Sequence, residues 1–154
     1  MTTRIVEAGA PFPAELRGAV VAFGNFDGVH RGHQQLLAAA EAEARRRNTH
    51  WGLVTFEPHP RTFFRPAEPA FRLTPLPLKA RLVAGLGASF TAVLSFDAAL
   101  AAMDPEVFVR KELSERLGAA HVVTGYDFHF GHGRKGTPET MRELGRQLGF
   151  GVTV

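Results

Sequence analysis

The stretch "AVVAFGNFDGVHRGHQQLL" (19–37) contains three different local patterns in direct succession. Residues 19–23 are an apolar run that stops at Gly24, which is typical of a buried strand. Residues 31–47 carry leucines and alanines at helical spacing, and three arginines (45–47) stand where the negative end of the helix dipole would lie. The stretch therefore predicts a strand, a glycine-rich turn and a helix.

The rest of the chain continues this alternation of strands and helices. Further strands are predicted at 51–56, 90–96 and 121–125, with the beginning of a fifth at 151–154. Further helices are predicted at 76–87, at 104–117 and from Thr137 to near Gly149; the last two begin with a capping residue followed by proline. Alternation of this kind predicts the α/β class, with a doubly wound parallel sheet covered on both faces.

The expected topology also predicts where a ligand binds. In open parallel sheets ligands bind beyond the carboxyl ends of the strands, where the strand order reverses. In a doubly wound sheet this point lies between the first strand (19–23) and the fourth (121–125). His30 and His33 follow the first of these strands, and "GYDFHFGHGRKG" (125–136) follows the other. The two segments richest in polar chemistry thus fall on the two sides of one predicted crevice.

Three glycines, Gly24, Gly28 and Gly32, surround the two histidines. Glycines let the backbone approach a ligand closely, and the start of a helix favours an anion. His30 and His33 are about one helical turn apart, so both rings can address one ligand and stabilise charge during phosphoryl or nucleotidyl transfer. A surface pair is the alternative. Half of a zinc site is disfavoured because no cysteine or third ligand is near, and no GKS or GKT follows that would make a Walker loop.

Composition bounds the class of protein. The 154 residues suggest one domain, predicted at 18–154 after an N-terminal segment at 1–17. The chain has no cysteine, which excludes disulfides and thiolate catalysis. It begins without a signal-peptide pattern and has no apolar run of membrane-span length, so we expect a cytoplasmic protein with no membrane partner.

The charge balance is weakly basic, at +3, and only three of the 18 basic residues are lysines. Arginine suits phosphate and carboxylate ligands, although a GC-rich coding sequence explains the same bias. No basic stripe is interleaved with aromatic residues, so a nucleic-acid partner is not expected.

Four segments, in order and in register, carry a family resemblance: "GNFDGVHRGHQQLL" (24–37), "TFEPHPRTFF" (55–64), "LTPLPLKARLV" (73–83) and "VVTGYDFHFGHGRKG" (122–136). Together they resemble the bacterial bifunctional FAD synthetases (riboflavin kinase/FMN adenylyltransferase), specifically the N-terminal adenylyltransferase module of the HxGH nucleotidyltransferase superfamily. The resemblance covers roughly residues 18–154. It implies a Rossmann-like domain that transfers an adenylyl group from ATP to FMN, giving FAD and pyrophosphate.

The resemblance assigns a role to particular positions. His30 and His33 would be the catalytic pair that binds the ATP phosphates. The expected nucleotide-binding residues are Gly24, Phe26, Asp27, Gly28, Gly32, Asp127 and Arg134. The expected flavin-side residues are Pro58, Pro60, Phe64, Phe108 and Phe130. For Phe108 a place in the core is an equal alternative, and for Asp127 a loop cap is the weaker of two alternatives. Mg²⁺ is expected to accompany ATP, but the sequence shows no dedicated carboxylate cluster for it.

Family members continue beyond the equivalent of "FGVTV" into a riboflavin kinase module. We therefore expect that the C-terminal part is missing here and that the full-length family protein carries that module. Two alternatives stay open. The chain could be a non-catalytic fragment that binds ATP or flavin, or a sister nucleotidyltransferase with another phosphate acceptor, although "FEPHP" (56–60) argues against a different acceptor.

Overall fold

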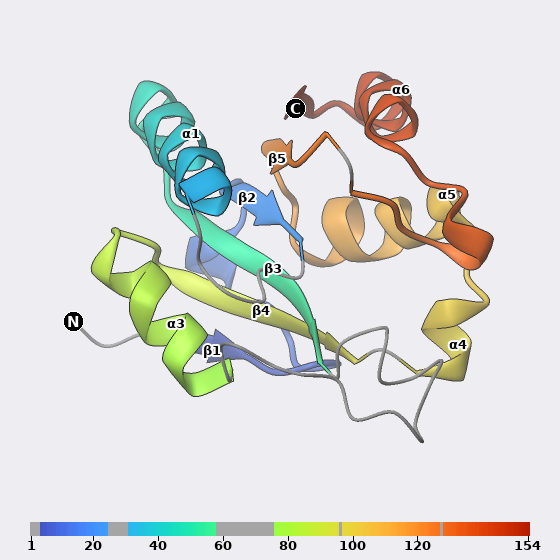
Figure 1. Cartoon of the computed structure of the whole chain (residues 1–154), viewed down its shortest axis with the longest axis horizontal. Coiled ribbons are helices and arrows are strands. Elements are labelled where there is room, and N and C mark those ends of the chain that lie inside the picture. Colours follow the sequence, from blue (N-terminus) through green and yellow to red (C-terminus); the bar gives the residue numbers. More distant parts are fainter. Residues whose placement is uncertain (1–3, 25–30, 58–75, 96, 127) are drawn as a thin grey trace.

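A computed structural model describes residues 4–24, 31–57, 76–95, 97–126 and 128–154. Its centre is a six-stranded sheet with the order β1-β4-β3-β2-β5-β6, in which every neighbouring pair is parallel (Figure 1). The strands are β1 (Arg4–Val6), β2 (Val20–Phe23), β3 (Trp51–Glu57), β4 (Phe90–Ser95), β5 (His121–Thr124) and β6 (Gly151–Thr153). The predicted α/β class with a parallel sheet is confirmed.

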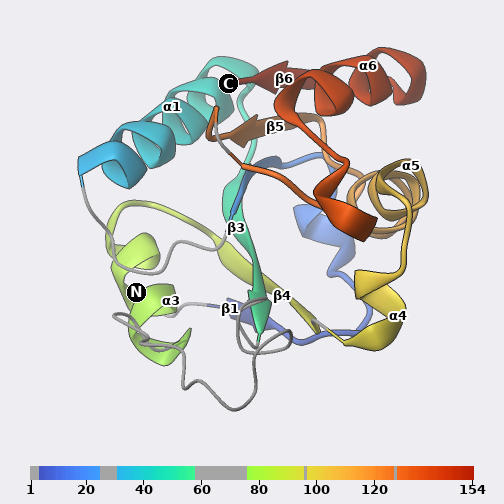
Figure 2. The same cartoon turned by 45° about the vertical axis from the view of Figure 1, so that its right-hand side comes forward.

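Helices cover both faces of this sheet. Their bounds are η1 (Ala14–Leu16), α1 (Arg31–Arg47), α3 (Leu76–Gly85), α4 (Ala98–Ala101), α5 (Pro105–Phe108), the π-helical η2 (Val109–Arg116), η3 (His132–Arg134) and α6 (Pro138–Leu148). In both views α1 and α3 lie on one side of the sheet, while α5, η2 and α6 lie on the other (Figures 1 and 2). Across the described residues, no helix combines the length and the apolar character that a membrane span requires.

Each face has its own apolar core. On the α1 and α3 side, Leu37, Ala40 and Ala44 of α1 pack on inward-facing residues of the central strands. On the opposite side, Leu113 and Met141 join a larger cluster that includes several phenylalanines. Strands β2 and β5 are buried along their whole length, which explains why their sequences are almost continuously apolar rather than alternating.

The strand order reverses between β2 and β5, as predicted. β2 pairs with β3 on one side and with β5 on the other, and Phe23 lies opposite Thr124 in the register. The chain therefore winds outward in both directions from this pair. The loops that leave the carboxyl ends of β2 and β5 start side by side, which is the arrangement expected of a ligand crevice.

The helix caps and helix bounds predicted from the sequence were confirmed in part. The side chain of Thr137 caps α6, accepting a hydrogen bond from the Thr140 N–H at 3.1 Å, and Gly149 ends that helix with a φ of 89°. Asp104 does occupy the cap position of α5, but its side chain makes no capping hydrogen bond. The single helix predicted at 104–117 is instead a short α-helix that continues into a π-helix. Strand β1, within the predicted N-terminal segment, and helix α4 were not predicted.

Candidate functional site

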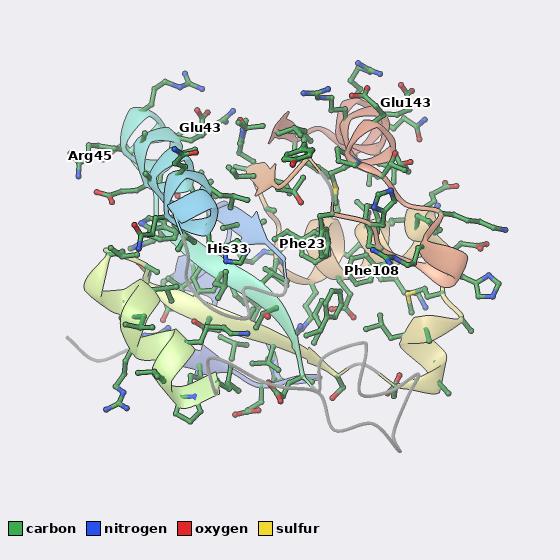
Figure 3. The ribbon with its side chains drawn as sticks, viewed as in Figure 1. Phe23, His33, Glu43, Arg45, Phe108 and Glu143 are labelled. Carbon is green, nitrogen blue, oxygen red and sulfur yellow. The ribbon has the colours of Figure 1, made fainter. Side chains whose placement is uncertain are left out.

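The carboxyl end of β2 leads to the start of α1. Gly24 directly follows β2, and its N–H donates to the Val54 carbonyl on β3 at 3.1 Å. After residues 25–30, α1 begins at Arg31, so that Gly32 and His33 lie in its first turn. N–H groups in a first turn lack intrahelical partners and carry the positive end of the helix dipole. His33 is half-buried and lies at the front end of α1, over the strands (Figure 3).

A side-chain hydrogen bond joins the carboxyl end of β5 to the carboxyl end of β2. The Thr124 hydroxyl, which is buried, donates to the Phe23 carbonyl at 3.2 Å. This bond adds to the ladder between the two strands and holds their ends at one level. The segment after β5 therefore starts within reach of the glycine-rich turn, as the topology predicted.

Beyond β5 the chain forms a narrow loop between Phe130 and Gly136. The two residues exchange backbone hydrogen bonds of 3.0 and 2.8 Å, and the N–H of His132 donates to the Met103 carbonyl at 2.9 Å. Arg134, at the tip, is exposed and has a φ of 55°, a left-handed conformation that is unusual for a residue with a side chain. The loop thus holds an exposed guanidinium group on a backbone with little freedom.

Five phenylalanine rings meet under these loops: Phe23, Phe56, Phe108, Phe128 and Phe130. Phe23 is at the centre, with ring centroids at 4.9 Å from Phe128 and 5.6 Å from Phe108. Figure 3 shows Phe23 and Phe108 side by side on the face opposite α3. We call these five residues the aromatic cluster. Offset and edge-to-face contacts of this kind contribute about 0.5–1.5 kcal/mol each beyond the area they bury.

Two of the expected flavin-side residues belong to the aromatic cluster. Phe108 is 2% exposed and Phe130 is 5% exposed, and both rings pack against Phe23. For Phe108 the sequence left core and flavin contact open, and the structure gives it a core position. A flavin contact by either ring stays a prediction. Of the cluster, Phe128 is the half-buried member.

The end of α1 remote from His33 carries a group of titratable side chains with shifted pKa values. Arg46 and Arg47 both donate to Glu43, which lowers the pKa of that carboxyl to about 2. His121, at the start of β5, is 7% exposed, and burial lowers the pKa of its imidazole. Arg47 donates to its Nδ1 at 3.2 Å, so Nε2 bears the proton that is donated to Thr153 Oγ1 at 2.7 Å. This network fastens α1, β5 and β6 together, away from the candidate site.

Comparison with known proteins decides the family. A family model described as FAD synthetase matches residues 12–154. The chain is 36% identical over 140 residues to the bifunctional riboflavin kinase/FMN adenylyltransferase of Escherichia coli (strain K12), covering 91% of this chain and 45% of that protein.

The chain belongs to the FAD synthetase family.

Other relatives agree with this family. The FAD synthetase of Listeria monocytogenes is 35% identical over 139 residues, covering 89% of this chain and 55% of that protein. A crystal structure of a macrolide-efflux protein from Streptococcus pneumoniae superposes with a TM-score of 0.78 over 98% of this chain and 50% of that one, at 23% identity, which shows the fold alone. The chain spans about half the length of the curated relatives it matches.

Several expected site residues of this FAD synthetase domain lie outside the described residues. These are His30, Phe26, Asp27, Gly28, Pro58, Pro60, Phe64 and Asp127. The described candidates are Gly24, Gly32, His33, Arg134, Phe108 and Phe130. Gly24, Gly32 and His33 lie together at the carboxyl end of β2 and the start of α1, whereas Arg134 lies in η3 beside α4, on the side of the sheet opposite α1 (Figures 1 and 2). In the described part of the chain no group of three metal-binding side chains occurs.

Lys79, within the segment 73–83 that carries part of the family resemblance, was not among the expected site residues but lies near this edge. Its ammonium nitrogen lies 3.5 Å from the hydroxyl of Thr55 on β3, and the residue is 4% exposed. Its position could have been found from spacing, because Lys79 stands four residues before Val83 and next to Ala80, both on the buried face of α3.

Proposed function

We propose that this domain transfers the adenylyl group of ATP to the phosphate of FMN, forming FAD and pyrophosphate. Membership of the FAD synthetase family supports the reaction class. The observation that carries the proposal is the pairing of β2 with β5. The segments that lead to His33 and to Arg134 leave the sheet at these two neighbouring strand ends, which supports a shared site because a helix start and a guanidinium group both attract phosphate.

The chemistry needs positioning more than proton transfer. An oxygen of the FMN phosphate attacks the α-phosphorus of ATP in line, the bond from that phosphorus to the bridging oxygen breaks, and pyrophosphate leaves. The FMN phosphate is already ionised at neutral pH, so no strong general base is required. The residues have to hold two polyanions together and stabilise the added charge of the transition state. Histidines, an arginine and a helix start meet that requirement.

Each expected residue has a distinct part in this proposal. His30 and His33 donate to the triphosphate, with Gly24, Gly28 and Gly32 leaving room for its approach. Arg134 contacts phosphate from the opposite side of the crevice.

Phe26, Asp27 and Asp127 are proposed to bind the nucleoside of ATP. Pro58, Pro60 and Phe64 are proposed to receive the flavin, over the aromatic cluster that contains Phe108 and Phe130.

A divalent ion, Mg²⁺ in this proposal, would screen the charge of the triphosphate. The described residues contain no three-ligand cluster, which fits an ion held largely by the phosphates themselves, as Mg²⁺ commonly is. The proposed place of the reaction is the cytoplasm, and in longer family members a riboflavin kinase module would supply the FMN.

The test is a FAD-formation assay with ATP, FMN and Mg²⁺, analysed by chromatography. We expect His33→Ala to lower the rate about 10²–10³-fold, the range found when one donor to transition-state charge is removed. His50→Ala is the matched control, because His50 is exposed and its carbonyl lies at the opposite end of β2. Binding of ATP or FMN by the unaltered chain without FAD formation would instead support the non-catalytic fragment.

FAD formation that His33→Ala leaves unchanged would refute the role of the histidine while retaining the reaction. Transfer to another phosphate acceptor in preference to FMN would favour the sister nucleotidyltransferase. Product analysis distinguishes transfer to FMN from transfer to another acceptor, and equilibrium binding identifies a chain that binds ATP or FMN without forming FAD.

A further inference from the structure

The imidazole of His121 joins three elements on the α1 side of the sheet. His121 lies opposite Gly151 of β6 in the register, and the residue is 7% exposed. Its Nδ1 accepts from Arg47 of α1 at 3.2 Å, and its Nε2 donates to Thr153 Oγ1 of β6 at 2.7 Å. The ring lies against Gly151, where an added Cβ would be 2.4 Å from Nδ1. One side chain therefore connects the outermost strand with the helix.

The bond from Arg47 requires the neutral imidazole in one tautomer. A guanidinium group can only donate, so Nδ1 of His121 has no proton, and the single proton of the neutral ring is on Nε2. A second proton, on Nδ1, turns this acceptor into a donor and removes the bond from Arg47. The bond from Nε2 to Thr153 survives protonation, so the loss arises on the α1 side of the ring.

The charges beside the ring disfavour an imidazolium. In the part of the chain that the structure describes, the charged groups that act on it all come from α1: Glu43, Arg46 and Arg47. Strand β6 faces the ring with the neutral hydroxyl of Thr153. Glu43 Oε1 lies 3.7 Å from Nδ1, but both arginines already donate to this carboxylate. Burial, together with this excess of positive charge, lowers the pKa of His121.

Strand β6 is the part of this network that can open most readily. It has three residues, all half-buried, and it stands at the end of the sheet, paired with β5. Short, partly exposed edge segments open locally at a low cost in free energy. We propose that His121 is a pH-sensitive switch for local opening of β6: the neutral ring holds the strand on β5 and α1, and protonation releases it so that water can hydrate the charged ring. This inference does not rest on the proposed function, because no step of it involves ATP or FMN.

The size of the effect follows from proton linkage. An imidazole exposed to water takes up a proton near pH 6.5, whereas the ring held by β6 takes it up only at lower pH. Lowering the pH from about 7.5 to about 5.5 is therefore expected to raise the opening equilibrium of β6 several-fold, to at most about tenfold. The increase begins near pH 6.5 and stops at the pKa of the held ring.

Hydrogen exchange of backbone amides in the 154-residue chain measures this opening. The Gly151 amide is the reporter, because it donates to the Ala120 carbonyl at 3.2 Å and is released when β6 opens. Rates are corrected for the intrinsic pH dependence of exchange.

Strand β1 is the internal control, because it is also a three-residue strand at an edge of the sheet. Its Arg4 pairs with Glu15, and the hydrogen bond from Arg4 lowers the pKa of that carboxyl, so this pair stays charged throughout the pH range. We expect the opening of β1 to change less than about twofold between the two pH values.

Three variants assign the effect to the ring. His121→Asn keeps a polar side chain that cannot take up a proton, so β6 should open equally at the two pH values. Arg47→Met keeps an unbranched stem but removes the donor and its charge, so the pH dependence should shrink because Glu43 can then stabilise the protonated ring. Arg45→Met is the matched control: Arg45 is exposed and pairs with Glu41, so this variant should keep the full pH dependence.

The ring of the unaltered protein can be observed directly, which covers the case in which His121→Asn does not fold. Nitrogen NMR spectra distinguish the tautomers, and at about pH 7.5 we expect His121 to carry its proton on Nε2. A proton on Nδ1 at that pH, or a titration midpoint at or above about pH 6.5, overturns the proposal. Equal pH dependence of β6 and β1, or pH-dependent opening of β6 that persists in His121→Asn, overturns it as well.

Discussion

Phe23→Ala tests whether the aromatic cluster supports the carboxyl edge of the sheet. Phe23 is fully buried and its ring contacts Phe56, Phe108, Phe128 and Phe130. Truncating a buried phenylalanine to alanine costs about 3–5 kcal/mol. The four ring contacts, at about 0.5–1.5 kcal/mol each, place this site in the upper part of that range, near 4–5 kcal/mol. For a domain of this size we expect the midpoint of thermal unfolding to fall by roughly 8–20 °C.

The assay is urea unfolding, followed by tryptophan fluorescence, with calorimetric melting as a second measure. Tyr126→Ala is the control, because Tyr126 is also aromatic and near β5 but is 83% exposed, so its loss should change stability by less than about 0.5 kcal/mol. Phe23→Leu keeps much of the volume and is expected to cost about 1–2 kcal/mol. A cost for Phe23→Ala below about 1.5 kcal/mol, or one equal to that of Tyr126→Ala, would refute the view that Phe23 is the centre of the cluster.

Three further predictions concern the loop and the opposite edge. Arg134→Gly relieves a left-handed backbone conformation, so thermal melting should show a stability within about 1 kcal/mol of the unaltered protein. Because the variant also removes the proposed phosphate contact, the KM for ATP in the FAD-formation assay should rise. Gly136→Ala would bring a Cβ to 2.7 Å from the Phe130 ring and carbonyl, and it should lower stability by about 1–3 kcal/mol in urea unfolding; a neutral result would contradict the tight loop. Burial lowers the pKa of His121 in the folded state, so near and below pH 6.5 the unfolded chain binds more protons than the folded one. The free energy of unfolding should therefore fall as the pH drops through about 6.5. In urea unfolding, His121→Asn should reduce the difference in stability between about pH 7.5 and about pH 5.5.

Local sequence signals were sufficient for the long elements of this fold. The bounds of α1 agree with the prediction at both ends, because leucines and alanines at helical spacing face the sheet and Glu43 pairs with Arg46 and Arg47 on the outside. The strand order between β2 and β5 followed from the alternation of elements alone.

What the sequence did not predict depends on contacts between distant segments. Strand β1 has only three residues at the sheet edge, too few for a periodic signal, and it is defined by pairing with β4. The π-helical turns of η2 use residues that fit an α-helix equally well. Burial of Phe108 under Phe23, and of Lys79 beside Thr55, required the packing of helices on the sheet.

Helix α1 is a continuous helix of 17 residues, about 25 Å long, that packs on the central strands β3, β2 and β5. Its front end carries His33, and its rear end is held by the contacts of Arg47 and Glu43 with His121, which in turn bonds to Thr153 on the outermost strand. The outermost strand and the start of α1 are therefore linked through this chain of contacts and the helix itself. Residues at the end of α1 remote from His33 are thus joined by one continuous helix to the helix start that we propose binds phosphate.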